Sequence, residues 1–68
     1  MHWTLETEQE DDGRWLAEVP EIPGALAYGE TRAAAMAKAE ALALRVLAER
    51  LEAGEAAPTA LQISLAAE

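Results

Sequence analysis

Most residues of this sequence that could carry out chemistry are carboxylates. Among the 68 residues, 13 are Asp or Glu, 5 are Lys or Arg and one is His, which gives a net charge of −8. Glu6, Glu8 and Glu18 fall in two strand-like segments, and converging carboxylates can hold the metal ions of a hydrolytic site. We favour the alternative that these are solvated strand residues, because Asp11 and Asp12, the acids between them, fall in a turn.

Other catalytic arrangements have less support. His2 is the single histidine and lies at a terminus prone to fray, and Ser64 has no identifiable basic partner. Cysteine is absent, which excludes disulfides, thiolate zinc sites and cysteine nucleophiles. We therefore expect no enzyme, no catalytic residue, no metal site and no cofactor.

The charge balance predicts the kind of partner. Nucleic-acid binding requires clustered Lys and Arg, whereas the five basic residues here are scattered, so we expect no direct nucleic-acid binding. An acidic field attracts a cationic partner; the alternative is that it only maintains solubility. The candidate partner-binding residues are the acids of the first half of the chain: Glu6, Glu8, Glu10, Asp11, Asp12, Glu18 and Glu21.

Length and composition indicate one small domain over residues 1–68. No apolar run approaches the ~20 residues of a membrane-spanning helix, and the N-terminus lacks the pattern of a signal peptide. We expect a soluble, cytoplasmic protein without a membrane partner. The absence of Cys and Asn hints at a thermophilic source.

Periodicity predicts the elements that position these residues. Alternation from Trp3 to Gln9 predicts a strand, and residues 14–19 form a second. A three-residue loop 11–13, with Gly13 left-handed, pairs Thr7 with Ala17 and leaves one face consistently apolar. Trp3 and Trp15 are then core residues rather than a ligand platform.

The segment Pro20-Glu21-Ile22-Pro23-Gly24 predicts a rigid corner, because each proline fixes its own φ and Gly24 supplies a conformation closed to other residues. A short third strand over residues 25–28 follows. A helix begins after the N-cap Thr31 and runs from Arg32 to about Ala53. Alternation at positions 61, 63 and 65 predicts a final strand.

The expected helix is apolar over about half of its circumference, which is more than one sheet contact requires. Ala35, Ala39 and Ala43 would let it lie close to the sheet. Leu44 and Leu51 on one flank either tuck under the final strand or form a second buried contact.

These features, taken in order, resemble the HicB-like antitoxin family of toxin–antitoxin systems, over about residues 3–65. The family pattern is an acidic-Gly turn, an aromatic strand ending in Pro-x-x-Pro-Gly, a short strand, Gly-Asp-Thr and a helix. The matching structural positions are Gly13, Pro20, Pro23, Gly24, Gly29 and Thr31. The chain departs from it at Ala25, where Cys is common, and at Ala34, where the family has Glu.

The resemblance implies a degraded ribonuclease-H-like α+β fold, β-β-β-α-β, with strand order 3-2-1-4 and one long helix across one face. Family members often carry a C-terminal DNA-binding segment, whereas this sequence ends at Glu68 directly after the final strand. We therefore do not carry over operator binding or autoregulation.

The resemblance also implies a function, which is neutralisation of a basic, RNA-cleaving toxin of the HicA type. The alternative is a stand-alone homo-oligomeric structural or regulatory protein without a toxin. In either case we expect a homodimer or higher oligomer, because so short a chain buries little core. Candidate interface residues are Leu16, Leu26 and Tyr28 on the open sheet face, which we favour, and Leu44 and Leu51 on the helix.

Overall fold

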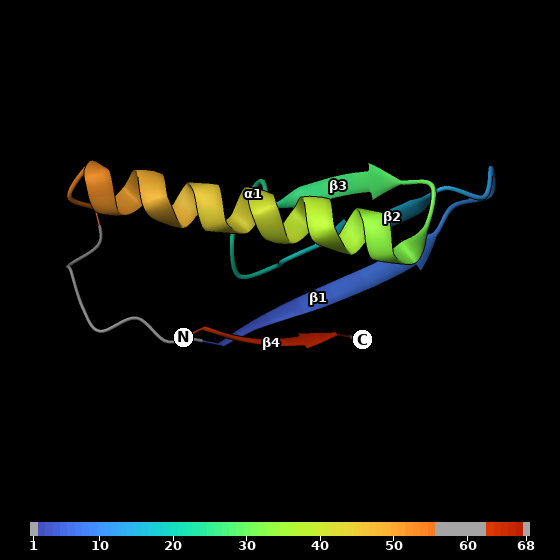
Figure 1. Cartoon of the computed structure of the whole chain (residues 1–68), viewed down its shortest axis with the longest axis horizontal. Coiled ribbons are helices and arrows are strands. Elements are labelled where there is room, and N and C mark those ends of the chain that lie inside the picture. The colour runs from blue at the N-terminus through green and yellow to red at the C-terminus, as the bar shows by residue number, and fades with distance from the viewer. Residues whose placement is uncertain (1, 56–62, 68) are drawn as a thin grey trace.

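A single helix crosses one face of a four-stranded mixed sheet in the computed structural model, which describes residues 2–55 and 63–67 (Figure 1). The strand order is β3-β2-β1-β4, with β4 parallel to β1 and the other neighbours antiparallel. This confirms the predicted α+β architecture and strand order. The elements are β1 (His2–Gln9), β2 (Trp15–Glu18), β3 (Leu26–Gly29), α1 (Arg32–Glu52) and β4 (Ser64–Ala67).

The β1–β2 hairpin has the predicted register. Thr7 lies opposite Ala17, and Gly13 adopts a φ of 91°. The Glu10 N–H donates to the Arg14 carbonyl at 2.8 Å, so residues 11–13 form the three-residue loop. This register directs one set of alternating side chains towards α1 and the other set away from it.

The core lies between α1 and the sheet. Trp3 and Leu5 of β1 and Ala17 of β2 are buried there, and Trp15 packs against them while partly exposed. From α1, the buried residues are Ala35, Ala39, Ala43 and Leu47. The small alanines allow the close approach that the sequence predicted.

Gly29 of β3 lies in close contact with the first turn of α1. A Cβ atom at this buried position would lie only 2.6 Å from the backbone N of Ala35. The strand therefore requires glycine where it passes under the first turn of α1.

The helix begins as predicted, with the Thr31 hydroxyl accepting a hydrogen bond from the Ala34 N–H at 3.0 Å. It lies over β3, β2 and β1, and among the described residues it makes no contact with β4. Leu44 and Leu51 are 43% and 38% exposed. The two leucines do not tuck under the final strand, so that alternative was wrong.

The Pro20–Gly24 segment forms two consecutive turns between β2 and β3. The Ile22 N–H donates to Val19 O at 3.0 Å, and the Ala25 N–H donates to Ile22 O at 3.1 Å. Pro23 and Gly24 occupy the central positions of the second turn, and Gly24 has a φ of 90°, as a type II turn requires. The corner redirects the chain as predicted, with Ile22 buried beneath it.

The final strand lies slightly later than predicted. Ile63 precedes β4, which begins at Ser64, while Leu65 lies opposite Trp3. The predicted position Leu61 lies outside the described residues. No helix in the described part of the chain combines the length and apolarity needed to cross a membrane.

Candidate protein-binding face

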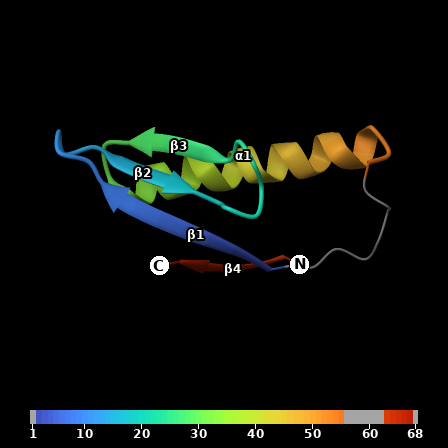
Figure 2. The same ribbon diagram turned by 180° about the vertical axis from the view of Figure 1, so that it is seen from behind.

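The side of the sheet that faces away from α1 is turned toward the viewer in Figure 2. It carries both acidic and apolar side chains. Alternate residues of β1, β2 and β3 point to this side because their neighbours in sequence face the core. Two cross-strand rows result, each combining acidic with apolar side chains. We call this surface the open sheet face; its rows are Glu8–Leu16–Tyr28 and Glu6–Glu18–Leu26.

Glu6 and Glu18 are directly opposite each other on neighbouring strands. Like charges in such a pair destabilise a sheet. Within the described residues, neither forms an ion pair that would offset the repulsion, and Glu8 in the next row forms none either. The open sheet face therefore presents concentrated, uncompensated negative charge.

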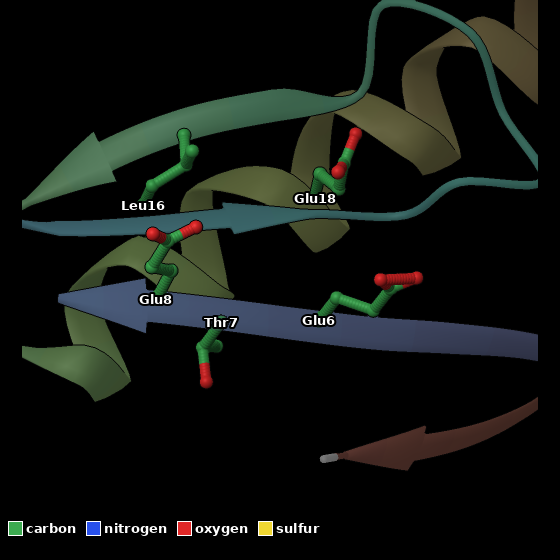
Figure 3. Close-up of a pocket in the computed structure, with 5 residues that line it drawn as sticks. All are labelled: Glu6, Thr7, Glu8, Leu16 and Glu18. Carbon is green, nitrogen blue, oxygen red and sulfur yellow. The ribbon is translucent and has the colours of Figure 1, made fainter.

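The three glutamates border a shallow hollow of about 150 Å³. Figure 3 shows Glu6 and Glu8 on the same side of β1, with Thr7 directed to the other side. The hollow is smaller than the ~300–1,000 Å³ of a typical small-molecule site. No group of three or more potential ligand side chains among residues 2–55 and 63–67 is arranged to hold a metal ion. The geometry suits contact with a large partner better than capture of a small ligand.

The apolar part of the open sheet face lies on β2 and β3. Leu26 and Tyr28 of β3 are 44% and 42% exposed, and Leu16 of β2 is half-buried. The Arg14 guanidinium carbon lies 4.7 Å from the centre of the Tyr28 ring, within the range of a cation–π contact. Lys38 reaches the same strand from α1, with Nζ 3.3 Å from the Tyr28 carbonyl oxygen.

Three of the predicted partner-binding acids lie at the turn of the β1–β2 hairpin. Glu10 directly precedes the three-residue loop and Asp11 begins it. Asp12 is paired with Arg14, whose Nε lies 2.8 Å from Oδ2. The Arg14 backbone N–H, donating at 3.0 Å, and then this side-chain bond lower the pKa of Asp12. Asp12 thus stabilises the turn, and its negative charge is already paired with the positive charge of Arg14.

Glu21 has a structural contact that sequence reasoning missed. Its carboxylate accepts hydrogen bonds from the backbone N–H and the hydroxyl of Thr4, both at 3.0 Å. These bonds, the backbone bond foremost, lower the pKa of Glu21. They tie the Pro20–Gly24 corner to β1. The only signal in the sequence was an acid between two prolines, which does not identify the residue it contacts.

The predicted oligomer-interface residues divide between two surfaces. Leu16, Leu26 and Tyr28 share the open sheet face with the glutamates. Leu44 and Leu51 lie on α1, on the other side of the sheet. The sequence favoured the sheet as the dimer contact because Leu44 and Leu51 could have been buried within one chain. Both are exposed, so this reason is removed.

We compared the chain with protein-family models, with curated proteins and with solved structures, and none of the three comparisons finds a match.

Proposed function

We propose that this chain is a small acidic protein-binding module of the HicB-like antitoxin type. In this proposal it neutralises a basic, RNA-cleaving toxin by occupying the surface that grips RNA. The observation that carries the proposal is the open sheet face, where uncompensated glutamates and exposed apolar side chains lie in the same cross-strand rows. The ordered series of motifs described above, together with the 3-2-1-4 strand order, supports the choice of family.

The mechanism would be electrostatic mimicry of RNA. A protein that binds RNA phosphates presents clustered positive charge. The opposed Glu6 and Glu18 offer a matching negative surface, and neither is ion-paired to a cation of the described residues. Charge complementarity would speed the encounter and select basic partners. The neighbouring Leu26 and Tyr28 would then exclude water from the centre of the contact.

The test requires a candidate toxin, which we would seek as a small basic protein encoded by a gene beside the one for this chain. The purified chain should inhibit RNA cleavage by that protein stoichiometrically at low salt, and inhibition should weaken as salt screens the charges. RNA cleavage that continues at full rate with the chain in excess would contradict the proposal, as would the absence of any neighbouring basic protein.

A second candidate is a self-associating structural or regulatory protein without a toxin. The exposed Leu44 and Leu51 favour it, because neither is needed for the proposed toxin contact. A stable oligomer that binds no basic protein would support this alternative.

A further inference from the structure

The outward side of α1 carries an apolar seam with heptad spacing. A surface helix normally presents polar and charged residues on the side opposite the core. Here the positions opposite the buried alanines are separated by alternating steps of three and four residues, and each is alanine or leucine. We call them the outer seam: Ala34, Ala37, Ala41, Leu44, Ala48 and Leu51.

The outer seam is uncovered in the described structure. No other described element crosses the side of α1 that faces the viewer in Figure 1. Leu44 and Leu51, one heptad apart, are two of the four large hydrophobic residues exposed in the described chain, and Ala37 and Ala48 are exposed as well. A seam of this spacing is the pattern by which two helices pack along their length.

We propose that the outer seam is a homodimer interface in which the helices of two copies pack antiparallel. The proposal goes beyond the proposed function, because it uses the side of the molecule away from the open sheet face. Both open sheet faces would remain free on the outside of the dimer. The assembly could therefore hold two basic partners at once.

Side-chain sizes favour a second copy as the occupant, and the antiparallel arrangement. The seam positions 34, 37, 41 and 48 hold alanine, and positions 44 and 51, both in the second half of α1, hold leucine. In an antiparallel pair each leucine of one copy meets an alanine of the other, so large and small side chains interlock. A parallel pair would stack alanine on alanine and leave gaps.

The charge distribution along α1 favours the same orientation. The first turn contains no acidic residue, and Lys38 follows one turn later. Glu49, Arg50 and Glu52 lie in the last two turns and together carry one net negative charge. Antiparallel packing places the acidic end of one helix beside the basic end of the other and also opposes the two helix dipoles. Parallel packing would bring the two acidic ends together.

The dimer should be weak. A helix of 21 residues is about 31 Å long at 1.5 Å per residue, so one helix pair gives an interface at the low end of specific contacts. We expect a monomer–dimer equilibrium at micromolar concentrations. Because each chain carries a charge of −8, added salt should tighten the dimer by screening repulsion. Binding of a basic partner should respond to salt in the opposite direction.

Sedimentation equilibrium of the full chain tests the interface with two matched variants. Leu44→Lys and Leu26→Lys replace leucines of nearly equal exposure, 43% and 44%, with the same charge change. Leu44→Lys should raise the dimer dissociation constant by about tenfold or more, and Leu26→Lys should not weaken the dimer. Circular dichroism checks that both are folded; if Leu44→Lys unfolds, Leu51→Lys at the end of the helix replaces it. A wild-type monomer, or a dimer lost in Leu26→Lys but retained in Leu44→Lys, would overturn the proposal.

Disulfide cross-linking tests the orientation, because the natural chain contains no cysteine. In an antiparallel pair centred on the seam, the two copies of Ala34 lie on the order of 25 Å apart. A disulfide requires Cα atoms within about 7 Å, so Ala34→Cys should give no cross-linked dimer under oxidation. Rapid cross-linking of this variant would show a parallel pair and refute the antiparallel arrangement.

Discussion

Glu21 shows how a single charged residue can act on the fold rather than on a partner. Its carboxylate accepts hydrogen bonds from the backbone N–H and the hydroxyl of Thr4. These bonds link the Pro20–Gly24 corner to β1. The stabilisation depends on the ionised carboxylate, because only that form accepts both bonds. Its lowered pKa expresses the same dependence.

This linkage predicts a pH dependence for Glu21. A depressed folded-state pKa contributes stability above the ordinary glutamate value of 4.5, and this contribution is lost as the pH falls through the lowered folded value. Glu21→Ala should therefore melt below wild type at neutral pH, and the difference should shrink in acid. Thermal melts of both proteins, from neutral pH down to below 4.5, measure this. A difference in melting temperature that stayed constant over that range would contradict the account.

Gly29 allows a second prediction at the scale of one residue. Gly29→Ala places a methyl group 2.6 Å from the Ala35 N, so strand and helix must separate, at a cost of about 1–3 kcal/mol. Gly54→Ala is the control. Gly54 has a φ of 76°, but a methyl group added there would meet no described atom within 4 Å, so only backbone strain of about 1 kcal/mol is expected. Urea unfolding should rank Gly29→Ala as the more destabilised variant; the reverse order would count against the close contact.

At the scale of elements, the antiparallel β1–β2–β3 sheet determines which side chains meet. The hairpin register could be predicted because a slip of one residue would have exchanged the core face with the open face. That argument correctly placed Glu6, Glu8 and Glu18 on one face with Leu16, Leu26 and Tyr28. It could not reveal the Glu21–Thr4 contact, which joins residues 17 positions apart and depends on how the corner folds back over β1.

The like-charge pair across β1 and β2 leads to a prediction with a built-in control. Glu6→Gln removes a charge opposite Glu18, whereas Glu8→Gln removes one opposite Leu16. Glu6→Gln should stabilise the protein by about 0.2–1 kcal/mol more than Glu8→Gln, and added salt should narrow the gap. Equal effects of the two substitutions in chemical denaturation would show that the pair carries no repulsion.

At the scale of the whole molecule, two surfaces with large apolar side chains are exposed in the described structure: the open sheet face and the outer seam. Their exposure does not stabilise the fold. The sequence predicted both surfaces in outline, because strand alternation and helix periodicity are local signals. Local signals could not predict whether β4 would lie against the helix, because that depends on long-range packing; in the described structure the two do not meet, and Leu44 and Leu51 are exposed. The sheet order came from the family resemblance rather than from periodicity.

The central claim is that the open sheet face binds a basic protein through its uncompensated glutamates. The most direct test is calorimetric titration of a small basic protein, if one is encoded beside this chain, into wild type, Glu6→Gln/Glu18→Gln and the helix control Glu49→Gln. The double variant should be as stable as wild type or more stable, and should bind roughly tenfold more weakly at low salt. Glu49→Gln should bind as wild type does. Equal affinity of the double variant and wild type, with both folded, would contradict the claim.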